Sequence, residues 1–292
     1  MLTLDSSDAP AAVLNNGAYL AAASSFAYWD EDKGREEFKA HLNLDARLIS
    51  VNNTQVFVAK NDTAIVAAFR GTESPTTLDG LKDCLLTDAN DMLILPEGRI
   101  GTDFAAAGVG ARYHRGFMTA LADIWDPLFS AIDGEMKKKE RLLWLTGHSL
   151  GGALALLAAW RFLQNFITVF RIYTFGAPMV GNPVAVQAFD KEFKGLVFRF
   201  VNEPDPVPHL PTVSLMANSY GHCLQEMLLK AADTEAQALG SAREAFRQLA
   251  GGQVGGLLDG SAIETVWNSV LARAGAHGIE NYRTLIANKC ID

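Results

Sequence analysis

Apolar and polar positions in the first third of the chain predict a pair of adjacent β-strands. Residues 55–60 and 63–70 are rich in β-branched and aromatic side chains, and the polar pair at 61–62 separates them. This spacing is typical of a β-hairpin. Residues 64–69 are apolar throughout, as expected for a strand that is covered on both faces of a sheet.

Three further apolar runs predict strands at residues 141–146, 170–175 and 197–201. Between the first two, residues 150–164 have the length and composition of a buried helix. Strands that alternate with helices, each strand being apolar, are typical of a mainly parallel sheet covered by helices on both faces. The pattern therefore predicts an α/β fold.

The two ends of the chain are expected to be mostly helical. Apolar side chains recur near helical spacing over residues 10–29, which predicts an amphipathic opening helix, and a solvated charged stretch follows at 30–39. Residues 220–229 alternate and fit either an outer strand or the start of a helix. From residue 231 onward the pattern is helical, interrupted by a glycine cluster at 251–260 that is more typical of a surface loop than of a phosphate loop.

Composition and charge narrow the class of protein. The chain has 292 residues, 49% of them hydrophobic, and no repeat or linker divides it, so we expect one domain over residues 1–292. The net charge of −8 argues against a nucleic-acid partner and gives no attraction to anionic lipid. The cysteines fit neither a disulfide framework nor a zinc site and are expected to be free thiols: Cys84, Cys223 and Cys290.

No segment of the sequence has the pattern of a membrane anchor or an export signal. A membrane span needs about 18 or more apolar residues in succession, and none is present. The first residues carry Asp5 and Asp8 where a signal peptide would carry lysine or arginine. The sequence thus predicts a cytoplasmic location by default, with export left open.

The strongest chemical signal is the pentapeptide Gly147-His148-Ser149-Leu150-Gly151. The pattern Gly-x-Ser-x-Gly is weak alone, but here it follows a predicted strand and opens a predicted helix. A turn this tight strains the serine backbone and lifts its hydroxyl above the sheet, which requires small residues two positions away. The context predicts Ser149 as the nucleophile of a serine hydrolase, the alternative being a glycine-rich turn with an incidental serine.

A serine nucleophile needs a carboxylate and a histidine, which in hydrolases with this turn follow it in that order. Asp205 comes after the strand at 197–201, where α/β active sites form, and prolines on either side fix its loop. Glu203 and Asp190 are the fallback carboxylates.

The downstream histidines are His209, His222 and His277. We favour His277, because it lies among small residues in a loop where flanking glycines allow close approach. The oxyanion that forms during acyl transfer needs two donors. We expect them at Thr72, which follows the strand ending at Phe69, and at the backbone N–H of Leu150.

These pieces, in this order, resemble the class 3, fungal-type triacylglycerol lipases of the α/β-hydrolase fold. The matching segments are Phe69–Thr72, His114–Phe117, Thr146–Gly152, Thr174–Pro178 with Val180–Asn182, Asn202–Pro208, and His277 with Tyr282. The resemblance implies a triad of Ser149, Asp205 and His277, with Thr72 and Leu150 as oxyanion donors. It further implies hydrolysis of a lipid or small ester at a transient lipid–water interface, without a metal or organic cofactor.

The resemblance also places a lid after the oxyanion strand, at about residues 73–113. Leucines recur at helical spacing between Leu78 and Leu86, which predicts a lid helix over Ser149, and glycine-rich residues 98–110 suit a mobile segment. Tyr220-Gly-His222 resembles a family element and favours a structural role for His222.

Several activities remain compatible with the sequence. The same triad could act on a phospholipid or a feruloyl ester, or transfer an acyl group to an alcohol. A peptidase of the same fold is a weaker alternative, because the motifs occur in the order of the lipase family. A non-catalytic lipid-binding protein is the alternative from another class, and the intact candidates for all three triad roles argue against it. The sequence predicts no particular oligomeric state.

Overall fold

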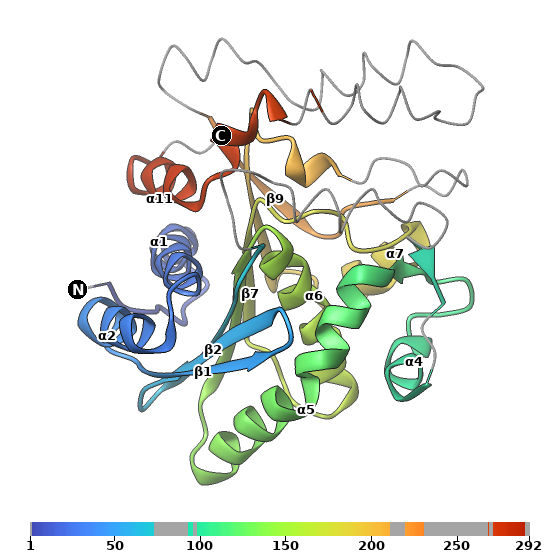
Figure 1. Ribbon diagram of the computed structural model, residues 1–292, viewed down its shortest axis with the longest axis horizontal. Helices are drawn as coiled ribbons and strands as arrows, with labels where there is room; N and C mark the ends of the chain where they lie inside the picture. Colours follow the sequence, from blue (N-terminus) through green and yellow to red (C-terminus); the bar gives the residue numbers. More distant parts are fainter. Residues whose placement is uncertain are drawn as a thin grey trace.

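A seven-stranded sheet runs through the protein in the order β1-β2-β3-β6-β7-β8-β9 (Figure 1). The computed structural model describes residues 2–72, 93–95, 98–210, 220–230, 268 and 271–289. The strands are β1 (Asp45–Val51), β2 (Thr54–Lys60), β3 (Ala64–Phe69), β6 (Leu142–His148), β7 (Arg171–Phe175), β8 (Val197–Asn202) and β9 (Gln225–Leu229). From β3 to β9 every neighbouring pair is parallel, so the predicted mainly parallel sheet is confirmed.

The antiparallel pairs lie at one edge of the sheet. β2 and β3 form the predicted hairpin, with Val56 opposite Phe69. β1 pairs with β2 on the outside, and the sequence pattern did not predict it because its exposed positions give it no continuous apolar run. β9 forms the opposite edge of the sheet and pairs with β8. Of the two alternatives for residues 220–229, the outer strand is therefore the one that the structure contains.

Helices cover both faces of the sheet, as predicted (Figure 1). One face carries α5 (Arg115–Lys138) and α6 (Leu150–Gln164), with α7 (Pro183–Glu192) and α4 (Gly98–Ala105) beyond them. The other face carries α1 (Pro10–Phe26), α2 (Glu31–Leu42) and α11 (Ile279–Ala287). The short elements are β4 (Leu93–Ile94) paired with β5 (Tyr113–His114), and the 3₁₀ turns η2 (Val207–His209) and η3 (Ala274–His277).

α1 is more deeply buried than an amphipathic helix would be, so that prediction is wrong. Residues 19–24 are all buried because α1 lies between the sheet on one side and α2 and α11 on the other. Its approach to the sheet is close: a Cβ at Gly17 would lie 2.8 Å from Cζ of Phe200. The charged stretch that follows forms α2, where Asp30 caps the first turn and Phe38 points into the core.

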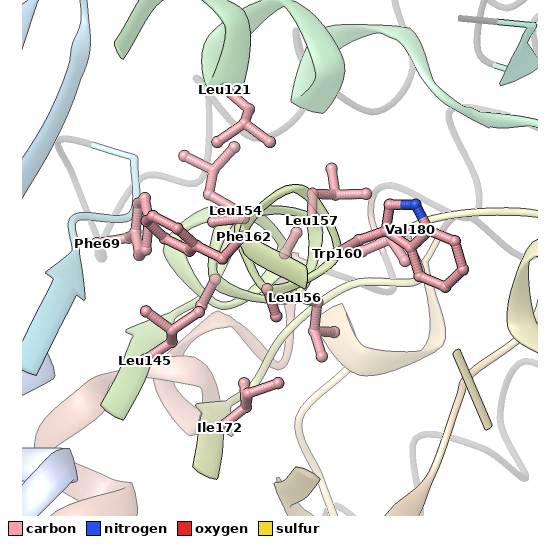
Figure 2. Packing of buried hydrophobic residues seen from close by; sticks show 14 of the residues in the cluster. Phe69, Leu121, Leu145, Leu154, Leu156, Leu157, Trp160, Phe162, Ile172 and Val180 are labelled. Carbon is pink, nitrogen blue, oxygen red and sulfur yellow. The ribbon is translucent and has the colours of Figure 1, made fainter. Parts of the chain in front are cut away.

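α6 lies in the middle of the larger hydrophobic cluster and is surrounded on every side (Figure 2). Leu145 and Ile172 of the sheet pack below it, and Leu121 of α5 packs above it. Full burial of a leucine or phenylalanine contributes about 1.5–3 kcal/mol. Leu154 and Leu157 are both buried, so packing holds α6 firmly and fixes the position of its N-terminus.

α4 is joined to α6 by hydrogen bonds, and the mobility expected for residues 98–110 stays a prediction. The Asp103 carboxylate accepts a hydrogen bond of 2.8 Å from Nε of the buried Arg161. The Asp103 carbonyl accepts another, of 2.9 Å, from Nε1 of Trp160. The predicted lid helix between Leu78 and Leu86 lies outside the described residues, as do the segments from 231 to 267.

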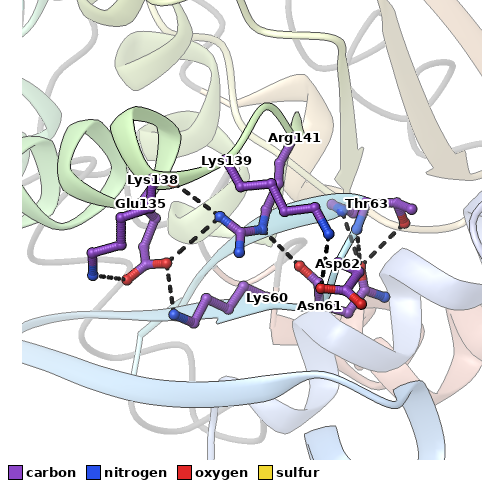
Figure 3. A network of polar contacts seen from close by, with 9 residues as sticks. Lys60, Asn61, Asp62, Thr63, Glu135, Lys138, Lys139 and Arg141 are labelled. Carbon is purple, nitrogen blue, oxygen red and sulfur yellow. Dashed lines mark hydrogen bonds and ion pairs between the residues drawn. The ribbon is translucent and has the colours of Figure 1, made fainter.

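A charged network on the side of the sheet away from the predicted site joins α5 to β2 and to the start of β6 (Figure 3). Glu135 accepts from Lys138 at 2.8 Å and from Lys60 at 2.6 Å, and Nη1 of Arg141 lies 3.6 Å from its carboxylate. The network therefore holds the end of the β2–β3 hairpin next to α5. Across the residues that the structure describes, we find no helix with the length and hydropathy needed to cross a membrane.

Candidate active site

Ser149 occupies a strained turn between β6 and α6. Its backbone has φ 57° and ψ −131°, a conformation that a non-glycine residue adopts only when the surrounding structure enforces it. Two close approaches do so: a Cβ at Gly147 would lie 2.3 Å from the carbonyl carbon of Gly151, and one at Gly151 would lie 2.2 Å from the Phe69 oxygen. The predicted turn and its need for both glycines are therefore present in the structure.

The end of β3 lies directly beside this turn. A Cβ at Gly71 would be 3.2 Å from Cβ of Ser149, and Thr72 is the next residue. Leu150 is the first residue of α6, where a backbone N–H has no acceptor within the helix and faces outward. Ser149 is 1% exposed, and its hydroxyl has no hydrogen-bond partner among the described residues.

Asp205 and His277 form a buried pair. Nδ1 of His277 lies 2.8 Å from Oδ2 of Asp205, and the two side chains are 1% and 0% exposed. The same Oδ2 accepts a hydrogen bond of 2.5 Å from the Tyr282 hydroxyl, and Oδ1 accepts one of 2.9 Å from the backbone N–H of Val207. Three donors therefore hold the carboxylate in one orientation.

The proton positions in this pair follow from its partners. The Asp205 carboxylate accepts, so Nδ1 of His277 carries a proton, and Nε2 is the ring nitrogen that remains to act as a base. Nε2 is buried and has no partner among the described residues. Burial, and then the negative charge of Asp205, raise the pKa of Tyr282 well above its usual value, which keeps its hydroxyl protonated as a donor.

Gly176, at the end of β7, makes room for the pair. Its φ is 60°, in the region that favours glycine, and a Cβ there would lie 2.9 Å from Oδ2 of Asp205. The same Cβ would lie 3.0 Å from both Cε1 of His277 and the Tyr282 hydroxyl. Gly176 thus lets three side chains from separate segments converge at the carboxyl edge of the sheet.

The other candidate residues lie elsewhere. Asp190 is on α7 and accepts a hydrogen bond of 2.7 Å from the Leu224 backbone. The Glu203 backbone N–H pairs with β9, and Nε2 of His222 contacts the Pro208 carbonyl. Asp205 is therefore the carboxylate, among the three considered, that meets His277, and His222 has the structural role that the sequence favoured.

Comparison with known proteins identifies the family of the chain. A family model described as lipase (class 3) matches residues 66–215, which is just over half of the chain. The chain belongs to the class 3 lipase family. The matched region contains the Ser149 turn and Asp205, while His277 lies after it.

Curated relatives are longer than the region they share with this chain. Toxin TseL of Vibrio cholerae is 32% identical over 213 residues, which are 67% of this chain and 30% of that protein. The secreted mono- and diacylglycerol lipase 3 of Gibberella zeae is 31% identical over 133 residues, which are 44% of this chain and 40% of that protein. The chain thus spans well under two thirds of the length of these relatives.

Solved structures support the fold. The Rhizomucor miehei triacylglyceride lipase superposes with a TM-score of 0.58 at 23% identity, covering 78% of this chain and 83% of that one. Lipase II from Rhizopus niveus gives a TM-score of 0.58 at 22% identity, covering 76% of this chain and 83% of that one. The α/β-hydrolase fold predicted for this chain is confirmed.

Several residues that contact the site were given no role by the sequence. Asn202 donates a hydrogen bond of 2.9 Å to the Ala276 carbonyl, and its backbone N–H donates to the Tyr282 hydroxyl at 3.2 Å. It therefore ties the end of β8 to the segment that carries His277. Its spacing from Asp205 in Asn-Glu-Pro-Asp was the only available signal. Tyr28 also contacts the site, through a hydrogen bond to His148. It comes from a distant segment, and no local sequence pattern predicts its role.

The remaining candidate ligands show no such convergence. Within the described ranges no group of three or more His, Cys, Asp or Glu side chains is placed to hold a metal ion. Cys223 is a free, buried thiol, and burial raises its pKa to about 12, so it is protonated at neutral pH. Cys84 and Cys290 lie outside the described residues.

Proposed function

We propose that this protein is a serine-dependent carboxylic ester hydrolase that acts on acylglycerols. The observation that carries the proposal is the buried hydrogen bond between Asp205 and His277, which leaves Nε2 of the ring without a partner among the described residues. The strained Ser149, whose hydroxyl also has no partner there, supplies the nucleophile. Membership of the class 3 lipase family supports the same chemistry.

In the proposed mechanism Ser149 Oγ attacks the ester carbonyl while Nε2 of His277 takes its proton. Asp205 stabilises the imidazolium through the Nδ1–H bond. The imidazolium then gives its proton to the departing alcohol, which leaves an acyl-serine. Water attacks this ester by the same route, passing its proton to His277 and releasing the fatty acid and the free serine.

In this proposal, Thr72 and Leu150 donate the hydrogen bonds that stabilise the tetrahedral oxyanion. Leu150 offers a backbone N–H at the N-terminus of α6, where the helix dipole favours negative charge. Gly71, at which a Cβ would lie 3.2 Å from Cβ of Ser149, directly precedes Thr72, and this closeness supports Thr72 as the second donor. Removing one such donor costs a hydrolase about 10²–10³ in kcat.

The assignment of acylglycerols rests on the relatives. The similar protein of Gibberella zeae is named a mono- and diacylglycerol lipase, and the similar structure from Rhizomucor miehei is a triacylglyceride lipase. A lipid substrate presented at a lipid–water interface fits both. Phospholipids, feruloyl esters and acyl transfer to alcohols are the competing uses of the same residues.

The activity is tested with p-nitrophenyl butyrate, a soluble ester. We expect turnover by the wild type and a loss of at least about 10⁴-fold in Ser149→Ala, because the nucleophile is gone. Ser50→Ala, at an exposed strand position, is the matched control and should turn over like the wild type. Wild-type turnover in Ser149→Ala would contradict the proposal.

The substrate class is tested separately by measuring fatty-acid release from mono-, di- and triacylglycerols and from phosphatidylcholine in mixed micelles. We expect the acylglycerols to be preferred. A preference for phosphatidylcholine would contradict acylglycerols as the substrate class and would leave the proposed mechanism unchanged.

A further inference from the structure

Tyr28 and His148 lie behind the Asp205–His277 pair and take part in no step of the mechanism above. Tyr28 follows α1, and His148 immediately precedes Ser149. The Tyr28 hydroxyl lies 2.8 Å from Nδ1 of His148, and Nε2 of His148 lies 2.6 Å from the backbone oxygen of His277. His148 is fully buried, so these two contacts use both of its ring nitrogens.

The direction of each hydrogen bond is fixed by its partners. A backbone carbonyl only accepts, so Nε2 of His148 carries a proton and donates it to the His277 oxygen. Burial, and then the neighbouring charge of His277, hold the pKa of His148 well below its usual value, so the ring is neutral. Nδ1 of the neutral ring is therefore an acceptor, and the Tyr28 hydroxyl donates to it.

The Tyr28 hydroxyl also packs against the end of β3. A Cβ at Gly71 would lie 2.2 Å from the hydroxyl oxygen. The same hydroxyl therefore contacts the segment that leads to Thr72 and donates a hydrogen bond to the His148 ring.

Ring packing completes the connection. The His148 and His277 rings lie with their centroids 4.5 Å apart and their planes at 33°. His148 therefore supports both the backbone and the imidazole of His277. Because its two nitrogens are already occupied, it is not able to take the proton that His277 receives from Ser149.

We propose that Tyr28 and His148 are positioning residues, which together set the separation between the oxyanion strand at Gly71 and the imidazole of His277. The hydrogen-bonded chain runs from the Tyr28 hydroxyl through the His148 ring to the His277 carbonyl, and the Tyr28 hydroxyl packs against Gly71. This role rests on the proposed hydrolase function and adds two residues to it.

The chain offers a matched control. Tyr19 lies on α1, is 1% exposed, and donates its hydroxyl proton to the Leu42 carbonyl at 2.8 Å. Tyr19→Phe removes a buried hydroxyl of the same kind at a place that does not touch the site. Tyr28→Phe removes the hydroxyl that joins Gly71 to His148.

The kinetic test measures kcat and KM on p-nitrophenyl butyrate. A displacement near 1 Å in a catalytic group costs about 10²-fold, and for the partial loosening in Tyr28→Phe we expect kcat to fall about tenfold with KM changed less than about twofold. Tyr19→Phe should keep the wild-type kcat even where its Tm falls. His148→Gln, whose amide has both a donor and an acceptor, should retain more kcat than His148→Leu.

A second readout does not need turnover. In ¹⁵N-histidine NMR spectra of the full chain we expect His148 as the Nε2–H tautomer with no titration between about pH 5 and pH 9. The low-field Nδ1–H resonance of His277 should weaken in Tyr28→Phe and persist in Tyr19→Phe. The NMR spectra therefore test the positioning role in any variant that folds, including a variant without activity.

The outcomes separate the two proposals. A wild-type kcat in Tyr28→Phe, together with an inactive Ser149→Ala, would overturn the positioning role and leave the hydrolase function intact. A His148 ring that titrates between pH 5 and pH 9, or that carries its proton on Nδ1, would also overturn the positioning role. Wild-type activity in Ser149→Ala would overturn the hydrolase mechanism, and the NMR spectra would then decide the hydrogen-bonded chain alone.

Discussion

Replacing Gly176 by alanine should impair catalysis by moving the Asp205–His277 pair while the fold is kept. The new Cβ would stand 2.9 Å from Oδ2 of Asp205 and 3.0 Å from both Cε1 of His277 and the Tyr282 hydroxyl. These separations are shorter than ordinary van der Waals contact, so the neighbours must withdraw by a few tenths of an ångström, up to about half an ångström. All three belong to the hydrogen-bonded cluster that orients the imidazole.

Two effects of this substitution can be given magnitudes. Forcing an alanine into the left-handed conformation at φ 60° costs about 1–2 kcal/mol, which lowers the Tm by a few degrees. A misplacement of 1 Å near the reacting atoms costs about 10²-fold in rate, so a shift of half that size should lower kcat by about tenfold or more. KM should change little, because Gly176 lies behind the pair.

Gly195→Ala separates the two effects. Gly195 has φ 76°, and a Cβ there would meet no atom within 4 Å. It therefore introduces the same backbone strain without the contact. We expect both variants to lose similar stability in thermal unfolding, and only Gly176→Ala to lose kcat on p-nitrophenyl butyrate. The reasoning is refuted by a wild-type kcat in Gly176→Ala, or by an equal loss in Gly195→Ala.

Three further predictions concern stability. Hydrogen bonds from Lys138 and Lys60 lower the pKa of Glu135 from 4.5 to about 2, so the stability that its carboxylate contributes is present above pH 4.5 and is lost as the pH falls towards 2. Glu135→Gln should therefore lower the free energy of unfolding at pH 6 by about 1 kcal/mol after solvent screening. If urea unfolding shows an equally large difference between variant and wild type at pH 3, the prediction is contradicted. Leu157→Ala, in the core between α5 and the sheet, should cost about 2–5 kcal/mol in the same assay. Tyr282→Phe removes a hydrogen bond to a buried carboxylate and should cost about 1.5–3 kcal/mol and lower kcat, so an unchanged kcat would argue against its contact with Asp205.

The central sheet was predictable because its strands carry their signal locally. Four central strands are mostly apolar runs that are buried on both faces, namely β3, β6, β7 and β8. The apolar runs alone locate them in the sequence. β1 was missed for the opposite reason: it lies at the edge, half exposed, and pairs only with β2. Edge strands gain their stability from a partner that the local pattern does not reveal.

Burial of α1 was also invisible to local pattern. An amphipathic helix was predicted from the recurrence of its apolar residues, but the face assumed to meet solvent is covered by α2 and α11. α11 lies more than 250 residues away in the chain, as the hydrogen bond between Ser25 and Glu280 shows. Only the tertiary structure reveals that covering.

For the candidate site, the sequence located the residues whose chemistry is tied to a motif. Ser149 lies in its own pentapeptide, and Asp205 in a proline-flanked loop after a strand. His277 was chosen from three histidines, and its hydrogen bond to Asp205 was then found. Tyr28 had no such signal, and Asn202 had only its place in the segment Asn202–Pro208, because both residues act through hydrogen bonds to distant segments.

Covalent labelling of the intact chain with an alkyl fluorophosphonate tests the central claim most directly. This reagent reacts with a serine hydroxyl only where a base activates it and an oxyanion is stabilised. The account predicts one equivalent bound per chain, located by peptide mass mapping on Ser149, with labelling slowed strongly in His277→Ala. Labelling on a different serine, or none in a folded protein, would contradict it.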